Sequence, residues 1–121
     1  GLLGHLNNMV VASNVQVEVS AVKVPLMSNV IQLANSGMIP GGTYHNLEYI
    51  GKSVSWRENV DEIFKVILCD PQTSGGLLIS VPEEKSSVLL DKLLYYGIDN
   101  SEIIGKVYNQ GELGLTPIIV N

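Results

Sequence analysis

Apolar residues recur along this chain at two spacings, which predict a mixture of strands and helices. Valines and an alanine alternate with polar residues over positions 15–21, a period of two that is typical of a half-buried strand. The alternation loses its phase at Val22 and Val24, so we expect a bulge or the strand end before Pro25. Helical spacing is predicted for residues 2–10, 27–36, 44–50, 59–69 and 83–96.

The clearest helical pattern covers residues 59–69. Its apolar residues follow the i, i+3, i+4, i+7, i+8 spacing from Val60 to Leu68, and Asn59 with Glu62 resembles a capping box. We expect Thr43 to cap the 44–50 helix, and Gly37 and Gly97 to follow the ends of two others. The residues expected in the core are Val17, Val19, Ile63, Phe64, Ile67, Leu90 and Leu94.

Three further apolar runs, at 77–81, 103–108 and 115–120, are predicted to be strands. Strands and helices do not alternate in a regular βαβ rhythm, so the pattern favours an α+β fold in which helices are layered on a mainly antiparallel sheet. A chain of 121 residues is long enough for one domain with a real core, and we expect residues 1–121 to form it.

Composition narrows the functional classes. No apolar run approaches the roughly 18 residues that span a bilayer. A net charge of −5 with scattered basic residues offers no surface for nucleic acid or an anionic membrane. The single cysteine excludes an internal disulfide, so we expect a cytoplasmic protein. The first helical pattern starts at Gly1 without a capping residue, which indicates a piece of a longer protein.

Residues 70–76 form the most informative segment. Asp-Pro, three short polar side chains and a glycine pair stand between two apolar segments. Proline and glycine shape the backbone, and paired glycines let it approach a ligand closely. An ordinary helix-to-strand connection needs fewer such residues. The composition therefore indicates a shaped loop of the kind that carries binding or catalytic groups.

Three segments together closely resemble one family. They are Gly-Leu-Leu-Gly-His at 1–5, Ile-Pro-Gly-Gly-Thr-Tyr-His-Asn at 39–46, and Leu-Cys-Asp-Pro-Gln-Thr-Ser-Gly-Gly-Leu-Leu at 68–78. The family is selenophosphate synthetase (selenide, water dikinase), within the aminoimidazole ribonucleotide synthetase superfamily. The resemblance covers essentially the whole chain, which is similar to the C-terminal half of those enzymes.

The resemblance implies an activity for the longer enzyme. That enzyme makes selenophosphate, AMP and phosphate from ATP, selenide and water, and so feeds selenocysteine biosynthesis. The family binds ATP and Mg²⁺ mainly in an N-terminal domain, whose glycine-rich segment carries a Lys and a reactive Cys or Sec. None of that segment is present in these residues, so we expect the chain alone to be inactive and to bind no cofactor tightly. The N-terminal domain is the implied partner, and a homodimer is implied at full length.

Within the loop, Asp70 is a candidate to bind Mg²⁺ or orient water. The alternative is that its side chain caps the following backbone. Phosphate oxygens are expected to meet donors of the same loop, and the alternative is that the hydroxyls bond their own backbone. These candidate donors are Gln72, Thr73, Ser74, Gly75 and Gly76.

A second candidate group precedes and opens the 44–50 helix, where paired glycines resemble an anion cradle. Its members are Gly41, Gly42, Thr43 and Asn46, and the alternative is a plain turn. His5 is a candidate proton carrier or a structural histidine, whereas His45 is expected to be exposed. Two distant histidines and one cysteine predict no zinc site.

Cys69 adjoins the loop, but it follows the apolar face of a helix near the negative end of the helix dipole. We therefore expect a small buried residue and not a nucleophile. Two other functions remain open: a non-catalytic binding or regulatory module of the same fold, and a related enzyme acting on a formylglycinamidine or carbamoyl substrate.

Overall fold

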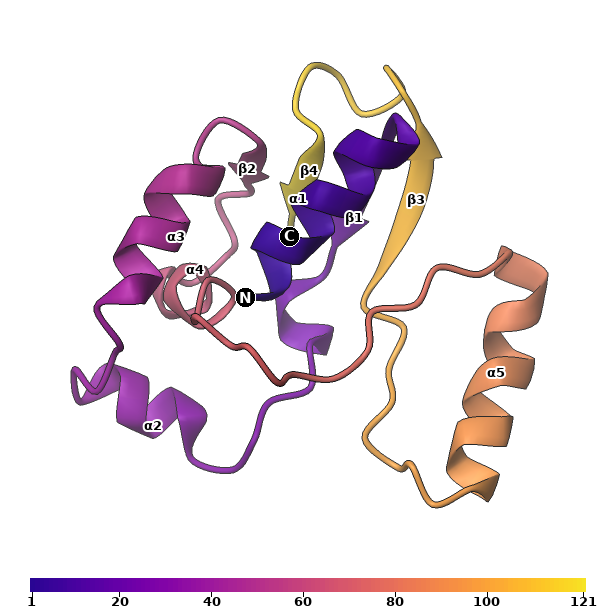
Figure 1. The fold of residues 1–121 in the computed structure, drawn as a ribbon, viewed down its shortest axis with the longest axis horizontal. Helices are drawn as coiled ribbons and strands as arrows, with labels where there is room; N and C mark the ends of the chain where they lie inside the picture. Colours follow the sequence, from indigo (N-terminus) through magenta and orange to yellow (C-terminus); the bar gives the residue numbers. More distant parts are fainter.

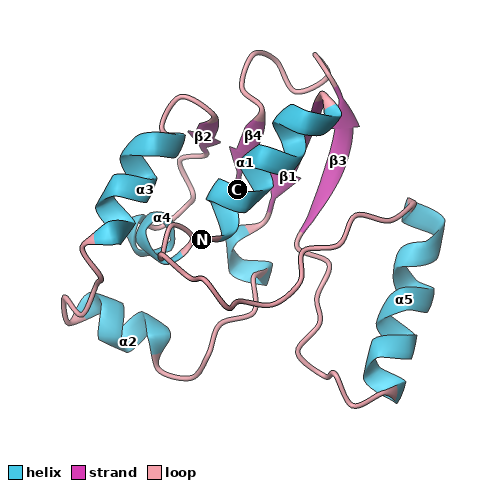
Figure 2. Ribbon diagram, in the orientation of Figure 1, coloured by secondary structure: helices cyan, strands magenta, loops and turns pink.

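A computed structural model describes all residues, 1–121. The chain forms five α-helices, four strands and one 3₁₀ turn (Figure 2). The helices are α1 (Leu2–Ser13), α2 (Val30–Asn35), α3 (Gly42–Ile50), α4 (Glu62–Ile67) and α5 (Glu83–Tyr95). The strands are β1 (Val15–Val19), β2 (Val54–Trp56), β3 (Gly105–Asn109) and β4 (Ile118–Val120), and the 3₁₀ turn η1 covers Ala21–Lys23.

The strands form one sheet in the order β2-β4-β1-β3. β1 runs antiparallel to β3 but parallel to β4, and β2 also runs parallel to β4. The α+β class is confirmed, but the sheet is mixed and not mainly antiparallel. Alternating residues predict that a segment is a strand and leave its direction undetermined, because direction depends on which distant segment it meets.

The core lies between α1 and one face of the sheet (Figure 1). Leu3, Leu6 and Val10 project from α1 at helical spacing, and all three are buried. They belong to the same cluster as Val17 and Val19 of β1, so both predictions for β1 are confirmed. The cluster also contains Ala21, Ile50, Val54, Val60, Leu68, Cys69, Ile118 and Val120.

The helical core predictions were less accurate. Leu94 is 62% exposed, so its predicted burial was wrong. Half-buried positions are occupied by Ile63, Phe64, Ile67 and Leu90. The cause is that α4 has only six residues and that α5 stands apart from the sheet (Figure 1). The apolar residues of α4 and α5 do lie at helical spacing, but too few other residues pack against them to bury them.

Several predicted element boundaries were wrong. Residues 77–81 are not part of the sheet, because no strand lies beside them to supply the ladder. The cap of α4 is Asp61, whose carboxylate accepts a hydrogen bond from the Ile63 amide at 3.1 Å, and not the Asn59–Glu62 pair. β2 was missed because its three residues are too few for a periodic pattern.

Thr43 also differs from its predicted role. Gly41 occupies the N-cap of α3, and the helix already includes Gly42. Thr43 is only 1% exposed, and its hydroxyl oxygen has no hydrogen-bond partner. The helix ends marked by glycine were predicted correctly, since Gly37 and Gly97 follow α2 and α5 with φ of 79° and 80°.

Gln16 is a polar residue on the face of β1 that alternation predicts to be exposed, yet it is fully buried. Its Nε2 donates to the carbonyls of Gly114 and Thr116 at 2.9 and 3.1 Å. Its Oε1 accepts from the amides of Gly111 and Leu113 at 3.0 and 2.8 Å. One side chain thus satisfies four backbone groups and fixes the connection between β3 and β4.

No helix combines the length and apolar character required to cross a membrane.

Adjacent valines in α1 test the position of the core. Val10 is 2% exposed and Val11 is 67% exposed. Val10→Ala should lower the free energy of unfolding by about 2 kcal/mol, because it removes buried methyl groups and leaves a cavity. Val11→Ala, which changes helix propensity equally, should differ from the wild type by less than about 0.5 kcal/mol. Urea titration measures both, and equal effects would contradict the assigned face of α1.

Candidate functional site

The three segments of the family resemblance meet in the structure around residues 68–71. The Leu3 amide donates to the Leu68 carbonyl at 3.3 Å, which joins the start of α1 to the end of α4. The Asn46 Nδ2 donates to the Cys69 carbonyl at 2.9 Å, which joins α3 to the same stretch. Segments separated by more than 20 positions in the sequence are therefore in direct contact at one place.

Two glycines allow this close approach. A Cβ on Gly1 would lie 2.1 Å from the Asp70 carbonyl oxygen, a distance that no side chain tolerates. A Cβ on Gly42 would lie 3.3 Å from Cγ of Pro71, a tight contact. The starts of α1 and α3 therefore both pack against the Asp-Pro dipeptide with little space left between them.

Asp70 is half-buried, and its backbone is fully engaged. Its amide donates to the Ile67 carbonyl at 3.1 Å, and its carbonyl accepts from the Gln72 amide at 2.7 Å. Its carboxylate accepts no hydrogen bond from the chain, so the side chain does not cap the following backbone here. The tight turn thus holds the backbone while both carboxylate oxygens stay available to a ligand.

The rest of the loop, residues 72–76, is exposed and makes no side-chain hydrogen bond within the chain. Thr73 and Ser74 therefore do not bond their own backbone, which was the alternative to a ligand role. The amides of Gly75 and Gly76 are also without partners in the chain. The loop offers several hydroxyl and N–H donors to whatever approaches it.

At the start of α3, the candidate residues do not play one common role. Gly41 and Gly42 lie in the first turn, and Gly42 faces Pro71. Asn46 uses a side-chain N–H on the Cys69 carbonyl, so this N–H holds the loop and is not free for phosphate. Thr43 keeps a buried hydroxyl without a partner. Within this group, Asn46 supports the loop, and the Thr43 hydroxyl oxygen is left without a hydrogen bond.

The histidines are both exposed. His5 lies one helical turn from Gly1, which packs against Asp70, and its amide donates to the Gly1 carbonyl at 3.1 Å. His45 lies on α3 and was expected to be exposed. No group of three or more His, Cys, Asp or Glu side chains is arranged to hold a metal ion by itself. Any cation bound through Asp70 would need further ligands from a substrate, from water or from another domain.

Cys69 is buried, as predicted. Burial raises the pKa of its thiol to about 11, and the positive charge of the N-terminal amino group acts in the opposite direction. A thiol with a raised pKa carries little thiolate near neutral pH and is a poor nucleophile. The free cysteine is therefore a packing residue at the base of the loop.

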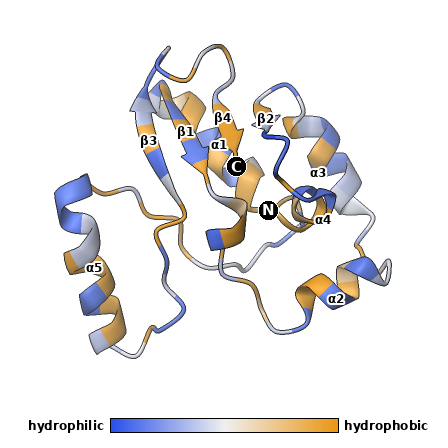
Figure 3. Ribbon diagram, turned by 180° about the vertical axis from the view of Figure 1, so that it is seen from behind, coloured by the Kyte–Doolittle hydropathy of each residue, from blue (hydrophilic) through white to orange (hydrophobic).

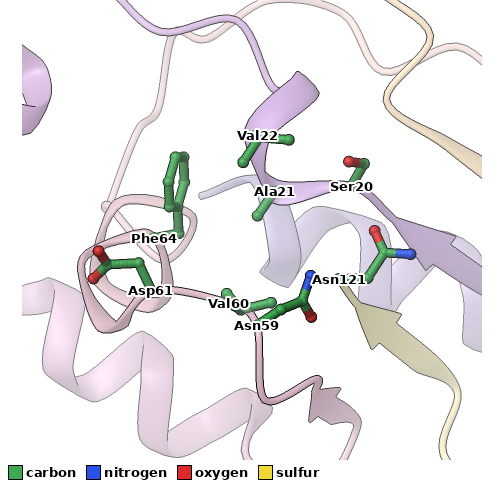
Figure 4. A pocket seen from close by; sticks show the side chains of 8 residues that line it. All are labelled: Ser20, Ala21, Val22, Asn59, Val60, Asp61, Phe64 and Asn121. Atoms are coloured by element: carbon green, nitrogen blue, oxygen red, sulfur yellow. The ribbon is translucent and has the colours of Figure 1, made fainter.

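A separate cavity of about 160 Å³ lies between η1, the start of α4 and the C-terminal residue. Phe64, Val22, Asn59 and Asn121 are among the residues that line it (Figure 4). Asp61 points away from the cavity, in agreement with its role as the cap of α4. Sequence analysis missed this cavity, because its lining comes from segments that carry no shared motif.

The raised pKa of the Cys69 thiol predicts slow modification. Because about two pKa units separate the folded thiol from its ordinary value of 9.0, the folded chain should react about 100-fold more slowly with a disulfide reagent at about pH 8 than the denatured chain. The same shift stabilises the folded state below the ordinary pKa, and this contribution is lost as the pH rises through about 11.

A matched control for this reaction is Ser74→Cys combined with Cys69→Ala, because residue 74 is exposed. That variant should react in the folded state as fast as it does in denaturant. Equal rates for the folded and denatured wild type would contradict the burial of Cys69.

The chain matches a protein family and several known proteins over nearly its whole length. Residues 1–117 match the family described as AIR synthase related protein, C-terminal domain. "Selenide, water dikinase" of Clostridioides difficile (strain 630) is 42% identical over 116 residues, which are 96% of this chain and 33% of that protein. "Selenide, water dikinase 2" of Peptoclostridium acidaminophilum is 42% identical over 118 residues, 98% of this chain and 34% of that protein.

"Selenide, water dikinase" of Campylobacter jejuni is 44% identical over 112 residues, 93% of this chain and 31% of that protein. The chain thus spans about a third of the length of these relatives. The family match covers nearly all of the chain, and the segments that carry the resemblance lie together in the fold. The chain therefore belongs to the family described as AIR synthase related protein, C-terminal domain.

Proposed function

We propose that this chain is the C-terminal domain of a selenide, water dikinase, which makes selenophosphate, AMP and phosphate from ATP, selenide and water. The observation that carries the proposal is the meeting of three segments at residues 68–71, under a loop whose polar groups are not used by the fold. The similarity to proteins named selenide, water dikinase over nearly the whole chain supports it.

In this proposal Asp70 helps to hold Mg²⁺. A carboxylate is the ligand type that Mg²⁺ prefers, and this one is held in a tight turn with no competing hydrogen bond. When bound, the ion would neutralise charge on phosphate oxygens. Since Asp70 belongs to no group of three or more His, Cys, Asp or Glu side chains that could hold a metal ion, substrate phosphates, water and the N-terminal domain would complete the coordination.

The remaining loop residues would contact phosphate oxygens. Gln72, Thr73 and Ser74 supply side-chain donors, and Gly75 and Gly76 supply backbone amides without internal partners. Asn46 acts indirectly, since it fixes the Cys69 carbonyl one residue before Asp70. Gly42 packs against Pro71, and Gly41 and Thr43 on either side of it are proposed to lie close to phosphate. His5 is proposed to carry a proton.

The reactive Cys or Sec is proposed to belong to the N-terminal, ATP-binding domain and not to this chain. The raised pKa of the Cys69 thiol supports this assignment. That N-terminal domain is the proposed partner of this chain within one cytoplasmic polypeptide, which is a homodimer at full length. Isolated, the chain is proposed to be inactive.

A chimaera tests the proposed function. This chain would replace the matching third of the Clostridioides difficile relative, so that the rest of that protein supplies ATP binding. We expect the chimaera to form selenophosphate and AMP, followed by ³¹P NMR, because the two sequences match over 96% of this chain. A folded chimaera that binds ATP but forms no selenophosphate would contradict the proposal and favour a non-catalytic module.

Asp70→Asn in the same chimaera tests the proposed Mg²⁺ ligand. Turnover should fall by about 100-fold and the half-saturating Mg²⁺ concentration should rise, because the substitution removes a charged ligand. The melting temperature should change little, since the Asp70 carboxylate accepts no hydrogen bond in the fold. Asp99→Asn, at an exposed position away from the loop, is the control. A lower melting temperature with activity that follows the folded fraction would instead indicate a structural role.

A further inference from the structure

The cavity of about 160 Å³ beside η1 shares no residue with the loop at 70–76 and has no part in the proposed function. Its lining comes from residues 20–22, from residues 59–61 with Phe64, and from Asn121 (Figure 4). Half of the lining residues are hydrophobic: Ala21, Val22, Val60 and Phe64. Apolar side chains combined with a few polar groups are the usual lining of a small-molecule site.

Asn121 is held in place by hydrogen bonds that leave one of its polar atoms free. It follows β4, which is hydrophobic along its length (Figure 3) and buried. Its amide donates to the Val19 carbonyl at 2.9 Å, and its carbonyl accepts from the Ala21 amide at 2.8 Å. Its Nδ2 donates to Glu18 Oε1 at 2.9 Å, and the Tyr108 hydroxyl donates to Glu18 Oε2 at 3.3 Å. The Asn121 Oδ1 is therefore a preorganised acceptor in the lining.

Ser20 and Asn59 add polar groups that the fold does not use. The Ser20 backbone is engaged, since its amide donates to the Ile104 carbonyl at 2.8 Å and its carbonyl accepts from the Lys23 amide at 3.1 Å. The Ser20 hydroxyl and the Asn59 carboxamide make no hydrogen bond within the chain. The cavity thus offers a ligand one hydroxyl, one fixed acceptor and one complete carboxamide.

The volume and charge of the cavity limit what it can hold. An apolar protein cavity of about 150 Å³ binds one benzene molecule, so a cavity of this size takes one small ring system and not a whole nucleotide. Phe64 brings an aromatic side chain to the lining, and aromatic side chains pack favourably against flat rings. No Lys, Arg or His lines the cavity, and its one charged residue is Asp61. An anionic group is therefore disfavoured inside it.

We infer that this cavity binds adenine, either free or as the base of a nucleotide whose sugar and phosphates stay outside. A carboxamide pairs with adenine through two hydrogen bonds, because it donates to N7 and accepts from the N6 amino group. The unused Asn59 side chain supplies both groups, and the Asn121 Oδ1 is a second acceptor for an amino group. Guanine presents the acceptor O6 in place of this amino group and is not matched. The inference does not depend on the proposed catalytic function.

Titration of adenine into the ¹⁵N-labelled 121-residue chain, followed by NMR, tests the inference. The amides of residues 20–22, 59–61 and 121 should shift with a dissociation constant of about 1 mM or lower. Purine, which is adenine without the amino group, should bind about tenfold more weakly, because it loses a hydrogen bond. AMP should bind no more than about tenfold tighter than adenine, because the lining carries no positive charge.

Asn59→Leu identifies the contact. It should weaken adenine binding at least about tenfold and abolish the difference between adenine and purine, because the carboxamide that pairs with the amino group is gone. Asn59 is exposed, so the melting temperature should change little. Asn100→Leu is the matched control, since Asn100 is exposed and lies outside the cavity; it should change the dissociation constant by less than about twofold.

Three results would overturn the inference. The first is the absence of shifts at the cavity residues up to about 5 mM adenine, and the second is an equal effect of the two variants. The third is AMP binding that is more than about tenfold tighter than adenine binding and that shifts residues 72–76, because the nucleotide would then lie at the loop.

Discussion

The parallel pairing of β1 with β4 is the contact on which the rest of this structure depends. It joins Val17 to Ile118, so the first and last strands lie side by side at the centre of the sheet. α1 can bury Leu3, Leu6 and Val10 only because these two strands form a continuous surface beneath it. A contact between such distant residues carries a large loop-closure cost, which the buried valines and isoleucines of both strands must offset.

Position, more than residue type, decides what the candidate site can do. The site is built on backbone packing: the missing side chains of Gly1 and Gly42 let two helices reach Asp70 and Pro71. The Asn46 side chain then fixes the carbonyl of Cys69. Because neighbouring residues hold the backbone in this way, the carboxylate of Asp70 makes no hydrogen bond within the fold. A rigid support beneath free polar groups is the arrangement that binding sites on loops require.

Sequence analysis predicted the elements that long periodic patterns determine, such as the α1 stripe and the alternating residues of β1. It could not predict which segments would meet. The direction of β4, the burial of Gln16 and the exposure of Leu94 all depend on distant partners. For the candidate site, the resemblance grouped the three segments, and the structure places them in contact. The sequence did not show that the Asn46 side chain donates its N–H to the Cys69 carbonyl. An asparagine after a turn can equally well donate to a ligand or to a backbone carbonyl.

The loop at residues 70–76 also connects the packed body of the chain to the segment that leads into α5. It leaves the body at Asp70, where the backbone is held by two hydrogen bonds, and it returns to the core at Leu78. The residues between make a single backbone hydrogen bond, from the Gln72 amide to the Asp70 carbonyl, so a ligand that orders the rest of them must offset their conformational entropy.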